Sequence, residues 1–317
     1  MNILEIRDLN LGFRTESGFF QALYDVNFDL KKGEMHALVG ESGCGKTITA
    51  MSILNLLPKN AHIISGQILF EGQNLIELDS KEYSKIRGSK IALIPQDPMT
   101  SLNPLYTVGN QLLEVLKIHR KLEGKEAVKV AIEALEQVKI PSAKERLNSY
   151  PHEFSGGMKQ RAIIAMALAC QAEILIADEP TTALDVTIQA QIMNILKEIK
   201  QDFETSIILI THDLGVVSEN ADKVSVMYSG RIVESAKAEE FFSNTKHPYS
   251  NALLNSLPSD KNLTLYTING QPPTIQQNIL GCKFHPRCAQ VMDVCKNNIP
   301  KLAESSDSHL CACHLYK

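Results

Sequence analysis

The residues best suited to chemistry form one glycine-rich segment, Gly40-Glu41-Ser42-Gly43-Cys44-Gly45-Lys46-Thr47. It has the Gly-x4-Gly-Lys-Ser/Thr spacing of a phosphate-binding P-loop, after an apolar run at Met35–Val39 and before a helix predicted to run towards Pro58. Glycines let backbone N–H groups turn towards phosphates, and the positive end of the following helix adds to the field. We expect Lys46 to bridge two phosphates of a nucleotide and the Thr47 hydroxyl to ligate Mg²⁺. We assign Cys44 no redox role.

Two acids end a later apolar run, Ile174-Leu-Ile-Ala-Asp178-Glu179. A carboxylate at a strand end suits a direct or water-mediated Mg²⁺ contact, which we predict for Asp178. Glu179, one residue further, is placed to polarise an attacking water as a general base. Acids that merely cap a strand are the alternative, and the P-loop in the same chain makes that alternative weaker.

A second glycine-rich helix start lies at Phe154-Ser155-Gly156-Gly157-Met158-Lys159-Gln160. Ser155 followed by two glycines forms an anion site that another molecule could approach closely, because no side chain blocks it. Since the P-loop already has Lys46, this second site makes sense if it faces the nucleotide of a partner subunit. The alternative is an ordinary helix cap with flexible glycines.

The elements that must position these residues alternate between short apolar runs and helical patterns. Predicted strands are Met35–Val39, Lys90–Ile94, Ile174–Ala177, Ser206–Thr211 and Lys223–Met227, and nearly continuous apolar runs of this kind fit a mostly parallel, buried sheet. Between Gly109 and Ile140 apolar residues recur at three- and four-residue steps, which predicts amphipathic helix. The members of this stripe are Val128, Ala131, Ile132, Leu135 and Val138. The fold class predicted is therefore α/β with a helical insertion.

Composition excludes several classes of protein. The chain has 317 residues, a net charge of −4 and 44% hydrophobic residues, which is typical of a globular protein and argues against a basic nucleic-acid binder. The longest apolar stretch, Ala162–Cys170, is about half the ~18 residues of a membrane-spanning helix, and acids at the N-terminus argue against a signal peptide. We therefore expect a soluble, cytosolic protein.

In their order along the chain, these motifs resemble the ATP-binding subunit of an ABC transporter. The P-loop resembles Walker A, Ser155–Gln160 the signature motif, and Asp178 with Glu179 the Walker B element and catalytic glutamate. Gln96 resembles the Q-loop glutamine, Ala183-Leu184-Asp185 the D-loop, and His212 the switch histidine.

The resemblance implies three sets of site residues. Catalysis would use Glu179, His212 and Gln96, and Mg²⁺ would be held by Thr47, Gln96 and Asp178. ATP would contact Phe13, the P-loop residues Gly40 to Thr47, Gln96, Asp178, and the signature residues Ser155, Gly156 and Gly157. Phe13 is the residue chosen to stack on adenine, with Phe19 and Phe20 as alternatives.

A closer resemblance is to the dipeptide/oligopeptide importer ATPases. It rests on four segments: Gln96-Asp-Pro-Met-Thr-Ser-Leu-Asn-Pro104, the Met-containing signature, Glu179-Pro-Thr-Thr-Ala-Leu-Asp-Val-Thr-Ile-Gln-Ala-Gln191, and His247-Pro-Tyr249. It implies a heterodimer with a second, non-identical ATPase, two permease subunits and an extracytoplasmic binding protein, at the cytoplasmic face of the membrane, with no nucleic acid. Nickel and other metal-chelate importers share the subfamily, so they are the alternative.

Five of the seven cysteines lie near the C-terminus, at Cys282, Cys288, Cys295, Cys311 and Cys313. Four thiolates suit Zn²⁺ or an iron–sulfur cluster, although the paired Cys-x2-Cys of common zinc ribbons is missing. Gly281–Cys288 and Ala312–His314 resemble the C-terminal extension of the peptide-importer ATPases, where the cysteines are associated with a [4Fe–4S] cluster. The ligands implied are Cys282, Cys288, Cys295 and Cys313, with Cys311 as a spare. Zn²⁺, reduced thiols in a small fold, and ligation by His285, His309 or His314 are the alternatives.

The predicted domains are an ATP-binding cassette at 1–257, with a helical subdomain at about 97–165, and a Cys-rich extension at 258–317. Rival classes are a soluble ABC ATPase of translation, which usually has two cassettes, and a DNA-repair ATPase, which needs a long coiled coil between its Walker motifs. A redox-sensing module whose function lies in the tail is the third.

Overall fold

A computed structural model describes residues 1–182, 184–256, 268–277, 279–306 and 308–316. The chain divides into two compact units, each considered by itself: unit 1 comprises Met1–Glu77 and Ile210–Lys317, and unit 2 comprises Leu78–Leu209. The predicted boundary between residues 257 and 258 lies outside the described residues, so the predicted domain limits stay a prediction.

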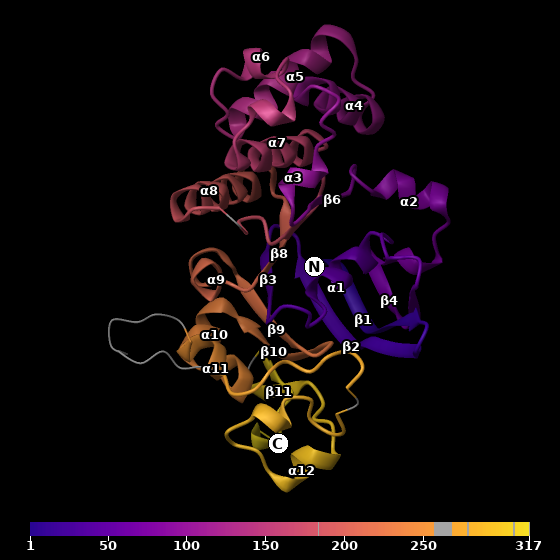
Figure 1. The fold of residues 1–317 in the computed structure, drawn as a ribbon, viewed down its shortest axis with the longest axis vertical. Coiled ribbons are helices and arrows are strands. Elements are labelled where there is room, and N and C mark those ends of the chain that lie inside the picture. The colour runs from indigo at the N-terminus through magenta and orange to yellow at the C-terminus, as the bar shows by residue number, and fades with distance from the viewer. Residues whose placement is uncertain (183, 257–267, 278, 307, 317) are drawn as a thin grey trace. The chain divides into compact units, whose positions relative to one another are not determined.

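Unit 1 begins with an antiparallel sheet in the order β2-β1-β4-β5 (Figure 1). Its strands are β1 (Asn2–Thr15), β2 (Gly18–Lys31), β4 (Ala61–Phe70) and β5 (Gln73–Asn74). None of these four strands is among those predicted from the sequence. Register shifts interrupt the pairing of β1 with β2 at four places, and such irregularities break the strict alternation by which a half-buried strand is recognised.

The second sheet of unit 1 places five strands in the order β11-β12-β10-β9-β3. They are β3 (Met35–Val39), β9 (Lys223–Tyr228), β10 (Arg231–Lys237), β11 (Ala303–Ser306) and β12 (His309–Cys311). β3 and β9 are parallel, whereas β9–β10, β10–β12 and β12–β11 are antiparallel. The mixed sheet is confirmed, but its C-terminal edge is antiparallel and is built by the extension.

The helices of unit 1 are short. They are α1 (Lys46–Ile53), α9 (Leu214–Asn220), α10 (Ala238–Ser243), α11 (Pro248–Asn255) and α12 (Asp293–Asn297), with 3₁₀ turns at Leu75–Glu77, His285–Arg287 and His314–Tyr316. The predicted helix after the P-loop is therefore confirmed, although it ends at Ile53 rather than continuing towards Pro58.

Unit 2 contains the strands β8, β7 and β6 in that order, with β6 and β7 parallel. They are β6 (Ile91–Ile94), β7 (Ile174–Asp178) and β8 (Ser206–Thr211), and the boundary between the units falls within β8. All residues of β7 and β8 are buried, as expected for apolar runs covered on both faces.

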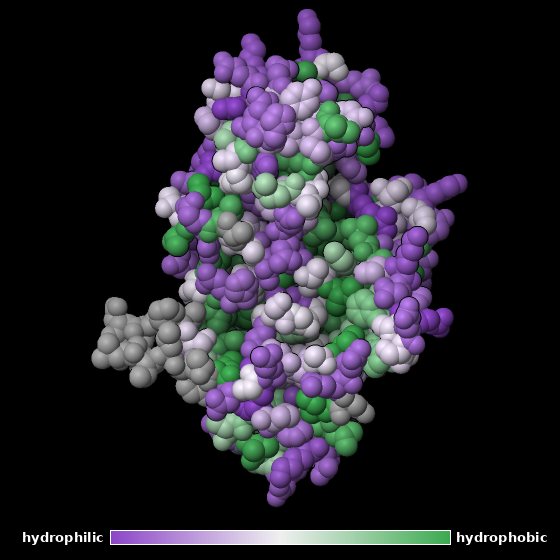
Figure 2. Space-filling model, viewed as in Figure 1, coloured by the Kyte–Doolittle hydropathy of each residue, from purple (hydrophilic) through white to green (hydrophobic). Residues whose placement is uncertain are grey.

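Helices α4 to α7 gather at one end of unit 2 (Figure 1). The helices of this unit are α2 (Ser80–Ile86), α3 (Pro98–Ser101), α4 (Val108–Arg120), α5 (Gly124–Gln137), α6 (Ala143–Arg146), α7 (Gly156–Ala169) and α8 (Val186–Phe203), with a 3₁₀ turn at Pro151–Glu153. Figure 2 shows mostly hydrophilic residues on the viewed face of this helical end, as expected for amphipathic helices with their apolar sides turned inward.

The predicted amphipathic stretch Gly109–Ile140 is two helices, because Lys121 adopts a left-handed conformation and ends α4. Leu135 and Val138 are fully buried, as predicted. Val128, however, is 38% exposed, and Ala127 takes its place on the buried face.

Candidate functional site

The P-loop connects β3 to α1 in unit 1. Gly45 forms the N-cap of α1 with φ +115°, a left-handed conformation that favours glycine, and no side chain caps the helix. A Cβ on Gly40, where φ is +153°, would lie 2.2 Å from the Met227 carbonyl oxygen. Both positions therefore require glycine, and no side chain of the described residues caps the start of α1, as suits a helix start that binds an anion.

Lys46 is 5% exposed, and its ammonium is held by the loop itself. Nζ donates hydrogen bonds to the carbonyl oxygens of Gly40 at 2.8 Å and Glu41 at 3.1 Å. Burial raises the pKa of the Cys44 thiol, which fits a packing residue rather than a reactive thiolate.

The P-loop also has contacts that the sequence did not predict. Arg287 in the extension donates to both carboxylate oxygens of Glu41, at 2.6 and 2.9 Å. The Glu41 N–H donates to the hydroxyl of Tyr249 at 2.9 Å. In the sequence, the motif His247-Pro-Tyr249 and the motif around Arg287 indicate a family, not a contact with the P-loop.

Gln96 and Glu179, predicted for the same site, meet in unit 2. The Gln96 Nε2 donates to Glu179 Oε2 at 2.9 Å, and Thr182 Oγ1 donates to the same oxygen at 2.9 Å. Glu179 has φ +45°, an unfavourable conformation for a residue with a Cβ, and such strain clusters at functional sites. Asp178, the last residue of β7, is buried.

The signature segment begins α7, and the structure confirms Ser155 as its N-cap, with the Ser155 hydroxyl accepting from Met158 N–H at 3.3 Å. The two glycines differ. A Cβ on Gly156 would reach only Leu184, at 3.9 Å, whereas a Cβ on Gly157 would lie 2.9 Å from Ile188 of α8. Gly156 keeps the helix start open, and Gly157 allows α8 to approach.

The remaining predicted residues are placed as follows. His212 is exposed and directly follows β8, before Asp213, which caps α9. Asp185 of the predicted D-loop caps α8 through the Ile188 N–H at 2.9 Å, while Ala183 lies outside the described residues.

Phe13 is opposite Phe20 on the β1–β2 hairpin, and the Phe19 ring lies over Gly12. The choice of Phe13 for adenine stays a prediction.

The four cysteines predicted to act together are neighbours in unit 1. Burial, together with the nearby thiols of Cys295, Cys313 and Cys288, raises the pKa of Cys282 to about 11. Burial also raises the pKa of Cys288 and of Cys313, and the Cys295 thiol adds to both increases. All seven cysteines are free thiols.

Cys311, the spare, has a different place. It lies in β12 opposite Glu234 of β10, and burial raises its pKa strongly. His309, an alternative ligand, is instead fully buried and 2.7 Å from Glu234. His285 and His314 bond to the carbonyl oxygens of Cys282 and Asn298. In the described part of the chain, no three His, Cys, Asp or Glu side chains have the arrangement of a metal-ion site.

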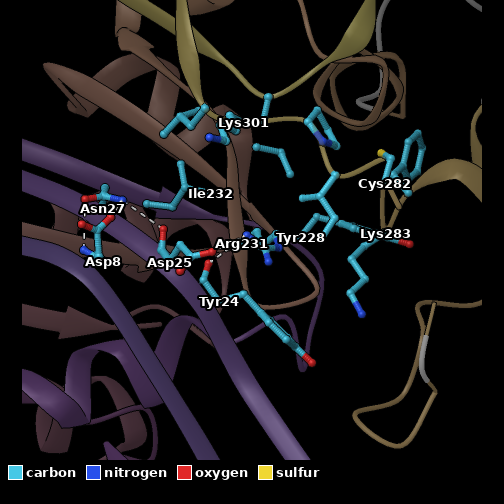
Figure 3. A pocket seen from close by; sticks show the side chains of 16 residues that line it. Asp8, Tyr24, Asp25, Asn27, Tyr228, Arg231, Ile232, Cys282, Lys283 and Lys301 are labelled. Carbon is cyan, nitrogen blue, oxygen red and sulfur yellow. Dashed lines mark hydrogen bonds and ion pairs between the residues drawn. The ribbon is translucent and has the colours of Figure 1, made fainter. Parts of the chain in front are cut away.

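A cavity of about 540 Å³ lies between the β1–β2 hairpin, β9, β10 and the extension (Figure 3). Arg231 and Lys283 each place their charge 5.0 Å from the centre of the Tyr24 ring. Of the described residues that line this cavity, only Cys282 belongs to a predicted site. The cavity is therefore separate from the predicted nucleotide site.

Within the described residues, no helix is both long enough and apolar enough to cross a membrane. Two family models match the chain: ABC transporter over residues 23–182, and oligopeptide/dipeptide transporter, C-terminal region, over residues 233–295. The second match includes the His247-Pro-Tyr249 motif and three of the four predicted ligand cysteines.

Curated relatives match along almost the whole chain. The dipeptide transport ATP-binding protein DppD of Bacillus subtilis is 50% identical, over 99% of this chain and 94% of its own length. The probable peptide ABC transporter ATP-binding protein y4tR of Sinorhizobium fredii is 49% identical, over 98% and 94%. The oligopeptide transport ATP-binding protein OppD of Salmonella typhimurium is 48% identical, over 98% and 93%.

Solved structures match the cassette. A dimeric, ADP- and phosphate-bound structure of the ATP-binding cassette MJ0796 has a TM-score of 0.67 at 27% identity, covering 74% of this chain and 98% of that one. CbiO1 from Clostridium perfringens has a TM-score of 0.66 at 31% identity, covering 77% and 91%. The chain is therefore an ABC-type ATPase and belongs to the ATP-binding subunits of the dipeptide/oligopeptide ABC transporter family.

Proposed function

We propose that this chain hydrolyses ATP to power the uptake of dipeptides or oligopeptides through permease subunits, at the cytoplasmic face of the membrane. The observation that carries the proposal is the similarity to peptide transport ATP-binding proteins over 97–99% of the chain. It includes the extension, which matches a family model of its own.

In this proposal the P-loop from Gly40 to Thr47 binds the phosphates of ATP. The glycines at positions 40 and 45 and the uncapped start of α1 fit that role. Lys46 would exchange its loop carbonyl partners for phosphate oxygens. Thr47, Gln96 and Asp178 would hold Mg²⁺, which supplies charge neutralisation at the phosphates.

Hydrolysis would use Glu179 as the general base. Hydrogen bonds donated by Gln96 and Thr182 to one carboxylate oxygen orient the side chain of Glu179. His212, exposed after β8, would contact the terminal phosphate, and Phe13 would stack on adenine.

We infer that the chain pairs with a second, non-identical ATPase subunit. Ser155, Gly156 and Gly157 would meet the ATP held by the partner's P-loop, because Ser155 is exposed, both glycines are partly exposed, and of the two only Gly157 is closely packed. Closure would then occur only with ATP bound, and this differential affinity drives the change of state.

The segment after Gln96 suits contact with a permease. Met99 is 60% exposed, Leu105 80% and Tyr106 54%. Large apolar side chains exposed so near one another mark an interaction surface. A binding protein on the other side of the membrane would deliver the peptide.

We also propose that Cys282, Cys288, Cys295 and Cys313 hold an iron–sulfur cluster, with a zinc ion as the alternative. The support for it is that the oligopeptide/dipeptide transporter C-terminal region model covers Cys282, Cys288 and Cys295, and that soft metals prefer thiolates. Among the described residues the four side chains do not themselves have the arrangement of a metal-ion site, so binding would require them to move. A bound metal would supply structural cross-linking of the extension. Metal and sulfide analysis with a visible spectrum, after anaerobic purification, distinguishes the two; a colourless protein with one zinc would overturn the cluster.

The decisive experiment is reconstitution of the complete transporter with its binding protein. We expect peptides to stimulate ATP hydrolysis, and Lys46→Ala in this chain to weaken ATP binding. Stimulation by a nickel chelate, with no response to peptides of any length, would overturn the peptide proposal while leaving the ATPase intact.

A further inference from the structure

Glu41, the second residue of the P-loop, is fixed at three points. Its carboxylate accepts two hydrogen bonds from Arg287, at 2.6 and 2.9 Å. Its N–H donates to the Tyr249 hydroxyl at 2.9 Å, and its carbonyl oxygen accepts from Lys46 at 3.1 Å. The place of Glu41 therefore affects where the Lys46 ammonium lies.

The ion pair between Arg287 and Glu41 is stronger than a salt bridge on the exposed surface. The Arg287 side chain is 6% exposed and that of Glu41 24%, so water screens the pair poorly. Two parallel charge-assisted hydrogen bonds fix direction as well as distance. Arg287 itself is anchored by the Asn269 carbonyl oxygen, 3.0 Å from Nε.

Tyr249 connects the same loop to the extension by packing. Its ring is fully buried and lies 4.6 Å from the ring of Tyr228 and 5.3 Å from that of Phe284. His247 accepts a hydrogen bond from the Tyr249 N–H at 3.1 Å and bonds to the backbone of Ala312. Two segments far apart in the chain thus meet at Glu41.

We propose that Arg287 and Tyr249 are positioning residues for ATP binding, through which the cysteine-bearing extension holds the P-loop in its binding conformation. Neither acts on the nucleotide directly; each acts through Glu41. A loop already held in the bound shape loses less entropy when the nucleotide binds. The inference rests on the proposed ATP site, and it gives the extension a function in the ATPase cycle beyond any metal it holds.

The test compares Arg287→Ala with Lys296→Ala. Lys296 forms an exposed ion pair with Asp293 in the same extension and has no contact with the P-loop in the described structure. In the complete transporter, we expect Arg287→Ala to raise the KM for ATP about tenfold with a smaller change in kcat, and Lys296→Ala to change neither. Tyr249→Phe, which removes only the hydroxyl, is expected to raise KM about threefold.

A double-mutant cycle separates positioning from loss of structure. In a Glu41→Ala background, Arg287→Ala should have little further effect on ATP affinity, since both act through one pair. The metal content and melting temperature of Arg287→Ala show whether the extension is intact. An unchanged KM in Arg287→Ala, or independent losses in the cycle, overturns the inference.

Lys46→Ala separates failure of this inference from failure of the proposed site. If Lys46→Ala weakens ATP binding and Arg287→Ala does not, the site stands and the positioning role is wrong. If Lys46→Ala leaves ATP binding unchanged, the proposed site itself is wrong.

Discussion

Two glycine-rich segments begin helices in this chain, and they are stabilised in different ways. The signature segment has a local cap, the Ser155 hydroxyl, and begins a helix of 14 residues. The P-loop begins a helix of 8 residues, has no side-chain cap, and is held by Arg287 and Tyr249. The signature segment is therefore self-sufficient and can present its N–H groups outward, whereas the P-loop depends on residues far away in the sequence.

The largest expected effect is the loss of ATP hydrolysis when the proposed general base is removed and both glycine-rich segments stay unchanged. Glu179→Gln keeps the shape of the side chain but removes the proposed base, so kcat should fall by about 10²- to 10⁴-fold. ATP binding should persist, because neither loop is altered. Single-turnover experiments with the purified transporter measure the rate of hydrolysis. The matched control is Glu173→Gln, which alters a carboxylate just before β7. Undiminished turnover would refute the base role.

The P-loop should tolerate substitution poorly. Gly40→Ala would place a Cβ 2.2 Å from the Met227 carbonyl oxygen and 2.8 Å from Cys44 Sγ, so we expect ATP affinity to fall about tenfold or more. Gly43→Ala is the control, because φ there is +77° but no atom lies within 4 Å of the new Cβ. It should cost only the ~1–2 kcal/mol of a left-handed alanine. Equal losses of affinity would show that backbone strain, not the clash, decides the effect.

The stability of the folded chain, including α11 with its contact to the P-loop, should depend on pH. Burial lowers the pKa of His247 to about 4, although nearby Glu234 opposes this, so the folded chain keeps the ring neutral where the unfolded chain, with a pKa near 6.5, binds a proton. Stability should therefore fall as pH decreases from 6.5 to 4, by up to about 3 kcal/mol.

Denaturant titrations at several pH values between 4 and 6.5 measure how steeply the free energy of unfolding changes with pH. His247→Asn should make this slope shallower but should not abolish it, because burial also lowers the pKa of His36, to about 3. An unchanged slope in His247→Asn would contradict the assignment.

The smallest effect tests the local cap of the signature segment. Ser155→Ala should destabilise unit 2 by about 1 kcal/mol, the usual cost of a lost N-cap. Thr107→Ala removes the cap of α4, where Thr107 Oγ1 accepts from Asn110 N–H at 3.1 Å, and should cost a similar amount. Only Ser155→Ala should also slow hydrolysis in the assembled transporter. If both variants slow it equally, the effect is on stability alone.

The features that could be predicted from the sequence are those encoded by residues close together in the chain. β3 and β8 were predicted to the residue, because each is a continuous apolar run buried on both faces. The motifs placed Gln96 and Glu179 at one site, and the structure joins them by a hydrogen bond. The cysteine motif favours Cys313 over Cys311 as a ligand, and that choice stays a prediction; Cys311 lies in β12 opposite Glu234.

The features that could not be predicted depend on contacts between distant residues, which leave no periodic pattern in the sequence. β12 has three residues and pairs with β10, about 75 residues earlier, so neither length nor alternation could reveal it. His309 was considered a possible metal ligand, but its partner is the buried Glu234. The salt bridge between Arg287 and Glu41 joins residues of two motifs that lie 246 positions apart, and neither motif indicates that it contacts the other.

Arg287 and Glu41 lie 246 residues apart in the chain. During synthesis at about 5–20 residues per second, the P-loop therefore leaves the ribosome roughly ten to fifty seconds before the arginine that holds it is made. Over that interval a nascent chain carries the binding motif without its final support. The affinity for ATP should thus reach its final value late in biogenesis, once the last part of the chain has folded onto the first.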